Sequence, residues 1–109
     1  MNIFIIIAGA FNILKSIRSK YSLNEEEASH VGELGTLIGT ITEAVMQNRF
    51  EYIQELDETQ YIIEVINFYS FEILNNSASS ELYSELIKSY ELLQEAVTQF
   101  LKQESDLQF

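Results

Sequence analysis

Residues 28–46, ASHVGELGTLIGTITEAVM, carry the pattern that decides the fold predicted from this sequence. Large apolar side chains recur there at steps of three and four residues, which is the spacing of one face of an α-helix. These side chains are Val31, Leu34, Ile38, Ile41 and Val45. The stretch therefore predicts an amphipathic helix that buries one face against the rest of the chain.

A stripe of small residues runs along the same helix, beside the apolar face. It consists of Ala28, Gly32, Gly35 and Gly39. A glycine inside a helix costs about 1 kcal/mol relative to alanine, so three aligned glycines require a compensating contact. We predict that another helix packs closely along this stripe.

The preceding segment, residues 1–20, predicts a helix whose first half is apolar nearly all round, as in a helix buried on several sides. Its core stripe is Ile3, Ile6 or Ile7, Ala10, Leu14 and Ile17. The β-branched run at residues 5–7 leaves a strand as the minority interpretation. A break follows at residues 21–24, where capping-box patterns precede the next helix. The two possible pairs are Ser22 with Glu25 and Asn24 with Glu27.

Two further breaks divide the rest of the chain. Asn48 followed by Glu51 fits another capping box, which predicts a sharp turn at residues 47–49, with a kink in one long helix as the alternative. Residues 75–80, NNSASS, predict a loop, because small polar side chains compete for backbone hydrogen bonds. The chain is thus expected to form four helices joined by short connections.

The third and fourth segments differ in their patterns. From Tyr61 onward the third segment is apolar on most of its circumference, which predicts the central helix of the fold. The last helix begins near Glu81 and has an apolar stripe, with fraying expected over about the last six residues. Its stripe is Leu82, Leu86, Leu93, Val97 and Phe100. We therefore predict an all-α fold, a compact antiparallel bundle of about four helices in one domain spanning residues 1–109.

The apolar N-terminal run fits neither a secretory signal nor a membrane span. Its cations follow the run instead of preceding it. As a helix, residues 3–14 would extend about 18 Å, whereas the hydrocarbon core of a bilayer is about 30 Å thick. We therefore do not expect a membrane protein, and we expect a cytoplasmic location.

The charge is strongly acidic and unevenly distributed. The formal net charge is −11, from 17 acidic and 6 basic residues. Residues 1–24 contain Lys15, Arg18, Lys20 and no acid, so they carry +3 and the remainder carries −14. Such a body repels phosphates, which argues against direct nucleic-acid binding and favours a basic protein partner. Plain solubility is the simpler interpretation of the same charge.

Few side chains suited to catalysis are present. The sequence has no cysteine, a single histidine and no glycine-rich phosphate-binding loop after a strand, so we predict neither an enzyme nor a cofactor. Glu27 and His30 form a Glu-x-x-His pair, the spacing that ferritin-like bundles use for metal ligands. With one histidine, only a symmetric dimer could complete such a site, which makes metal binding a remote alternative.

A protein-binding role remains. The six tyrosines stand largely among glutamates, and exposed tyrosine beside carboxylate is typical of a binding hot spot for a basic partner. The surface predicted on this basis comprises Tyr52, Glu55, Tyr83, Glu85, Tyr90, Glu91 and Glu95. The size and charge favour a stoichiometric inhibitor, immunity or antagonist protein of phage or plasmid type. Two alternatives stay open: the tyrosines belong to the core, or the chain is a homodimeric structural or regulatory module that associates through residues 3–14.

Overall fold

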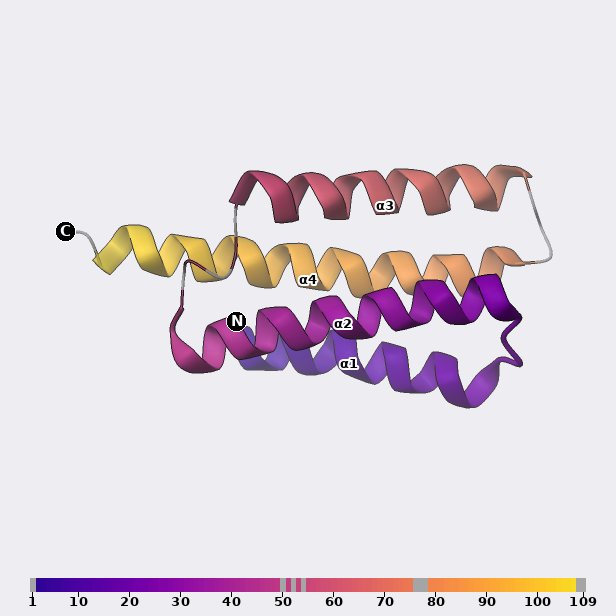
Figure 1. Cartoon of the computed structure of the whole chain (residues 1–109), viewed down its shortest axis with the longest axis horizontal. Coiled ribbons are helices and arrows are strands. Elements are labelled where there is room, and N and C mark those ends of the chain that lie inside the picture. Colours follow the sequence, from indigo (N-terminus) through magenta and orange to yellow (C-terminus); the bar gives the residue numbers. More distant parts are fainter. Residues whose placement is uncertain (1, 50, 52, 54, 76–78, 108–109) are drawn as a thin grey trace.

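The computed structural model describes residues 2–49, 51, 53, 55–75 and 79–107, without the side chains of residues 55–57 and 104–107. These residues form four helices, α1 (Ile3–Lys20), α2 (Glu25–Gln47), α3 (Glu55–Asn75) and α4 (Ser80–Leu107). The helices run along one long axis in a body of 50 × 25 × 23 Å, as Figure 1 shows. The predicted all-α antiparallel bundle is confirmed.

The start of α2 is fixed by one of the two predicted capping boxes. The Glu27 backbone N–H donates to Asn24 Oδ1 at 2.8 Å, and the Asn24 N–H donates to Glu27 Oε1 at 2.9 Å. Two backbone donors at the helix end are thereby satisfied. The three glutamates of the first turn also lie at the positive end of the helix dipole.

The end of α2 is a sharp break and not a kink. Asn48 has left-handed backbone angles, φ 54° and ψ 42°, and its N–H bonds back to the carbonyls of the last turn. Asn48 is therefore the C-cap of α2, and the prediction that it caps the start of the third helix is wrong. The physical reason is that asparagine tolerates the left-handed conformation that ends a helix. The third helix begins at Glu55 instead of near residue 49.

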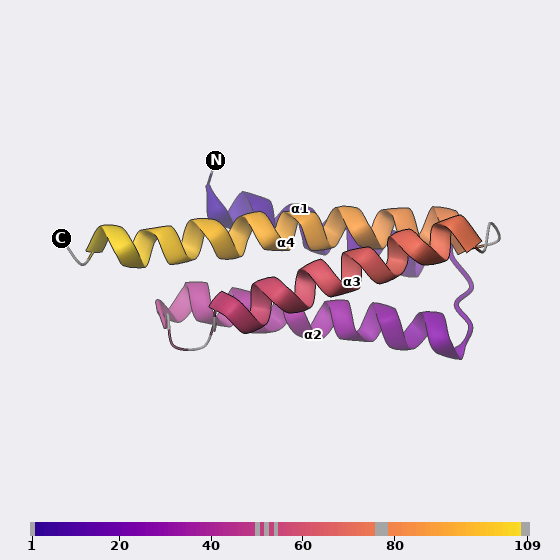
Figure 2. The ribbon, with the colours of Figure 1, turned by 90° about the horizontal axis from the view of Figure 1, so that it is seen from above.

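The central element of the bundle is α4, which packs against α1, α2 and α3 (Figures 1 and 2). Its inner face is buried over its described length, from Leu82 to Phe100. Within the described residues, the α3 backbone comes close to α4 alone, and only Ile62 and Tyr69 of its sequence from Tyr61 onward are fully buried. The prediction that this segment is the central helix is therefore wrong.

Helices α1 and α4 approach each other closely where small residues line both of them. Ala10, Ser89 and Ala96 are fully buried, and the Ser89 hydroxyl donates to the Ala10 carbonyl at 3.1 Å. A Cβ atom built on Gly9 would lie 3.3 Å from Leu92 Cδ1, which is a tight contact. The glycine that admits a neighbouring helix is thus Gly9 of α1, not a member of the stripe on α2.

Candidate functional site

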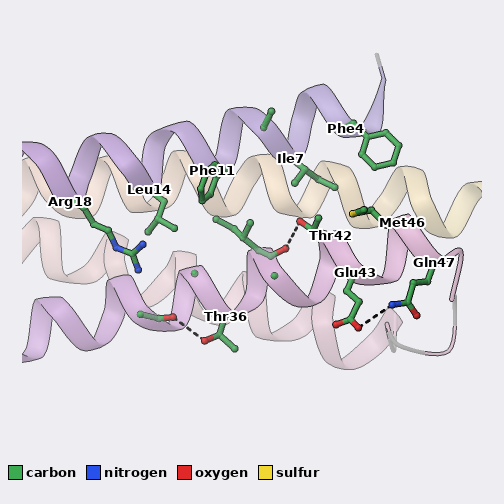
Figure 3. Close-up of a pocket in the computed structure, with 15 residues that line it drawn as sticks. Phe4, Ile7, Phe11, Leu14, Arg18, Thr36, Thr42, Glu43, Met46 and Gln47 are labelled. Atoms are coloured by element: carbon green, nitrogen blue, oxygen red, sulfur yellow. Dashed lines mark hydrogen bonds between the residues drawn. The ribbon is translucent and has the colours of Figure 1, made fainter.

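A groove with a volume of about 1010 Å³ lies between α1 and α2 (Figure 3). We call it the α1/α2 groove. Its α1 wall consists of Phe4, Ile7, Ala8, Phe11, Leu14 and Arg18. Its α2 wall consists of Gly32, Gly35, Thr36, Ile38, Gly39, Thr42, Glu43, Met46 and Gln47. The predicted small-residue stripe therefore forms much of one wall of an open depression.

Within the described part of the chain, no other helix makes a tight contact with the glycine stripe of α2. Among the residues that the structure describes, a Cβ atom built on Gly32 or Gly39 would meet nothing within 4 Å. A Cβ atom on Gly35 would lie 3.4 Å from Arg18 Nη2 and 3.6 Å from Leu14 Cδ2, which are ordinary contacts. Ala28, at the start of the stripe, is exposed. The prediction of a close-packing seam inside this chain is wrong, because α1 makes its close contact with α4 instead.

The rim of the groove is made of large apolar side chains that the chain leaves uncovered. Phe4 is 50 %, Phe11 44 % and Met46 70 % exposed. Figure 3 shows Phe4 and Met46 together at one end and Arg18 at the other. Exposed apolar side chains grouped around a depression are typical of an interaction site, whereas isolated ones are ordinary.

The polar groups of the groove separate into two kinds. The hydroxyls of Thr36 and Thr42 donate to carbonyls of their own helix, at 3.1 and 2.7 Å, so they need no ligand. Arg18 and Glu43 are exposed, and neither has an ion pair within the described part of the chain. Glu43 accepts a hydrogen bond from Gln47 at 3.1 Å. The groove is therefore apolar, with a cation and an anion available at different points along it.

A second uncovered apolar surface lies on α3, and we call it the α3 outer face. It comprises Ile63, Phe71 and Leu74, which are 39 %, 63 % and 84 % exposed. Their spacing places them on one side of the helix, with α4 covering another side. Sequence reasoning missed this face because an apolar circumference was interpreted as burial on all sides.

The predicted tyrosine–glutamate surface does not form as expected. Tyr83 and Tyr90 are 4 % and 0 % exposed, so both belong to the core and neither serves as a surface anchor. For Tyr83 and Tyr90, the alternative interpretation, in which the tyrosines belong to the core, is therefore correct. Glu91 and Glu95 are exposed on α4. Tyr52 and the side chain of Glu55 lie outside the described residues.

The buried tyrosines belong to an aromatic cluster at the junction of α2, α3 and α4. The rings of Tyr69 and Tyr83 stack with centroids 5.1 Å apart, and Tyr90 lies 6.0 Å from Tyr69. His30 of α2 meets Tyr69 edge-on at 5.3 Å. Burial raises the pKa of all three tyrosines, because an apolar environment disfavours the phenolate.

Glu85 was predicted as part of the binding surface, but it joins α4 to the end of α1. Its carboxylate accepts from Lys20 Nζ at 2.8 Å and from the Tyr21 hydroxyl at 2.6 Å. Partial burial raises the pKa of Glu85, but the hydrogen bonds from Lys20 and Tyr21 outweigh burial, and the pKa lies below its usual range. The hydrogen bond that Tyr21 donates to Glu85 also raises the pKa of Tyr21, to about 12.

We expect Glu85→Gln to lower the free energy of unfolding at neutral pH by about 1 kcal/mol. The expected loss is this small because Lys20 is exposed, and solvent screens its attraction to the Glu85 carboxylate. Glu91→Gln, which removes the same charge from an exposed position, should change it little. The pKa of Glu85 is lowered in the folded state. The ionised carboxylate therefore stabilises the fold above the usual carboxyl pKa, and this stabilisation is lost as pH falls through the folded pKa. Urea unfolding of both variants at neutral and acid pH measures this. An equal effect of the two substitutions would contradict it.

The residues of the remote metal hypothesis have other roles. Glu27 belongs to the capping box and also accepts from the Ser79 hydroxyl at 3.2 Å. The nearest carboxylate to His30 is that of Glu26, 3.8 Å from Nε2. Within the described residues, no group of three His, Cys, Asp or Glu side chains could hold a metal ion. Glu27 and His30 therefore act here as a helix cap and as a member of the aromatic cluster.

Comparisons with protein families, curated proteins and solved structures found no match to this chain. Of the helices in the described part, none combines the length and apolarity needed to cross a bilayer. The two uncovered apolar surfaces and the charge are therefore the features of this chain that bear on its function.

Proposed function

We propose that this chain acts in the cytoplasm by binding a basic protein partner, as a stoichiometric inhibitor, immunity or antagonist protein, and not by catalysis. The observation that supports this role is the α3 outer face. Ile63, Phe71 and Leu74 stand exposed on α3, whose backbone comes close to α4 alone among the described residues. Aromatic and aliphatic side chains in such a patch are the anchors of protein interfaces.

The charge of α3 and of the whole chain favours a cationic partner. Helix α3 contains no Lys, Arg or His, and its acidic residues are Glu55, Asp57, Glu58, Glu64 and Glu72. The whole chain carries −11. An apolar patch within a negative surface attracts a basic surface during encounter and holds it by apolar burial afterwards. The partner that fits this surface is a basic, amphipathic helix or helical surface.

The test is co-purification from the native cells with wild-type chain and with two double variants. Phe71→Ser with Leu74→Ser removes two anchors of the α3 outer face without changing the charge. Phe4→Ser with Met46→Ser makes a matched change at the α1/α2 groove. We expect a basic partner with wild type and with the groove variant, and at least a tenfold loss of binding with the face variant.

Association with the isolated partner should then slow as ionic strength rises, because steering between opposite charges is screened. A partner retained equally by the face variant, or an acidic partner, would contradict the proposal.

A second candidate function, the self-associating structural or regulatory module, is favoured by the α1/α2 groove. Its uncovered apolar rim includes side chains of the N-terminal helix, Phe4 and Phe11. The two functions use different surfaces and are compatible.

A further inference from the structure

A small pocket with a volume of about 170 Å³ lies between α2 and α3, and we call it the aromatic pocket. Its lining includes His30 and Glu33 of α2 and Tyr61, Glu64, Phe68 and Tyr69 of α3. Pockets that bind cofactors or drug-sized ligands usually measure about 300–1,000 Å³, so this one suits the end of a single side chain. We propose that it receives the cationic end of a lysine or arginine side chain of the basic protein partner. This inference rests on the proposed function and names the type of side chain that anchors the partner.

The first argument is the aromatic lining of the pocket. The ring of Tyr69 is buried, and its centroid lies 5.7 Å from that of Phe68 and 5.3 Å from that of His30. The rings of Phe68 and Tyr61 are partly exposed, so they line the pocket where it meets solvent. A cation within about 6 Å of an aromatic ring is attracted by the negative charge of the ring face, and more strongly when it is desolvated. The lining therefore favours a cation on an alkyl chain over an anion.

The second argument is the charge of the pocket. Glu33 and Glu64 line it from different helices, and neither forms an ion pair with another described residue. Glu64 accepts a hydrogen bond from Gln60 Nε2 at 3.1 Å, which leaves its negative charge uncompensated. Burial is the largest cause of the raised pKa of Tyr69, and the charge of Glu33 adds to it, so this carboxylate acts on a ring of the pocket. The described lining contains no lysine or arginine, and a cation from a partner would balance the two carboxylates.

The third argument is that the aromatic pocket adjoins the α3 outer face. Phe68 follows Glu64 by four residues and precedes Phe71 by three, and side chains at these spacings are neighbours on a helix. Phe68 thus lies between the pocket and the exposed side chains of Phe71 and Leu74. A basic amphipathic helix that covers the α3 outer face with its apolar side chains therefore brings its flanking cations to the pocket. The apolar contact and the cationic anchor then belong to one interface.

The test uses the isolated chain and two small probes, butylammonium and propylguanidinium chloride, which carry the charged ends of lysine and arginine side chains. The chain has a single histidine, so the imidazole proton signals in its NMR spectrum report on His30 in the pocket. We expect at least one probe to shift these signals saturably, relative to sodium chloride at equal ionic strength. 1-Butanol, which has the alkyl chain of butylammonium without the charge, should not shift them. Signals that neither probe moves, or that 1-butanol moves equally, overturn the proposal.

Matched variants assign the binding to the pocket. Glu33→Gln with Glu64→Gln removes two charges from the lining, and we expect the affinity for the probe to fall at least about tenfold. Glu91→Gln with Glu95→Gln removes the same charge from exposed positions of α4 and should change the affinity little. Phe68→Leu keeps an apolar side chain without the ring, and we expect a loss of about two- to fivefold. Circular dichroism checks that each variant remains helical. Equal losses in the two glutamine pairs would reflect the overall charge alone and overturn the proposed site.

The partner found by co-purification separates this inference from the proposed function. Because the probes need no partner, the Phe71→Ser, Leu74→Ser variant should bind them as wild type does while it loses the partner. The Glu33→Gln, Glu64→Gln variant keeps the α3 outer face and should bind the partner at least about tenfold more weakly than wild type at equal ionic strength. Wild-type affinity of this variant for a basic partner would overturn the pocket as an anchor and leave the proposed function intact.

Discussion

Truncating Leu86 to alanine should lower the free energy of unfolding by about 2–5 kcal/mol, a large part of the stability of a chain of this size. Leu86 is 0 % exposed and lies on α4, which packs against the other three helices. Removing its side chain leaves a cavity between helices that are held by other contacts and cannot collapse fully. Chemical denaturation followed by circular dichroism measures the loss.

The matched variant is Phe71→Ala on α3, which removes a larger side chain from a position that is 63 % exposed. We expect a change within about 0.5 kcal/mol, because little buried surface is lost and alanine is a better helix former. The pair of variants tests which helix is central. If Phe71→Ala were the more damaging, α3 would be the buried helix that its sequence pattern predicts, and the arrangement around α4 would be incorrect.

The helices and their inner faces could be predicted because they depend on local spacing. Val31, Leu34, Ile38 and Ile41 of α2 are all buried, as are all members of the predicted α1 and α4 stripes. A period of 3.6 residues determines which side chains share a face whatever the partner is. The capping box at Asn24 is also local, since its donors and acceptors lie three residues apart.

The arrangement of the helices depends on which helix faces meet. The spacing of apolar residues along a helix carries little information on which other helix will cover its apolar face. The glycines of α2 resemble a packing seam more strongly than the lone Gly9, yet Gly9 is the one in a tight contact with α4. The α3 sequence is apolar enough for a central helix, yet Leu74 is 84 % exposed. In both cases the sequence identifies a surface able to pack, and the tertiary structure decides whether this chain supplies the partner.

The tyrosines show the same limit for the candidate site. A tyrosine beside glutamates in sequence is equally compatible with a surface anchor and with a ring in the core, because neighbours in a helix point in different directions. Tyr83 and Tyr90 occupy the core side of α4, and Glu91 is on the exposed side. The burial of these rings has a consequence for stability at alkaline pH.

We expect the chain to unfold cooperatively in alkali, because Tyr69 and Tyr90 must stay neutral while folded. They are 1 % and 0 % exposed, and burial raises the pKa of both well above the ordinary value of 10.0. The unfolded chain releases these protons near pH 10, so the stabilisation is complete below that pH and is lost as pH rises toward the folded pKa. Each such tyrosine costs about 1.4 kcal/mol per pH unit above 10.

Tyrosinate absorbance and circular dichroism, recorded on the same alkaline titration, measure this coupling. In denaturant, all six tyrosines should ionise near pH 10. In the folded chain, the signals from Tyr69 and Tyr90 should appear only together with the loss of helix. Tyr90→Phe removes one ionisable group from the core, so the unfolding midpoint should move to higher pH. Full tyrosine ionisation near pH 10 with the helix signal intact would place these rings in solvent and contradict the core around α4.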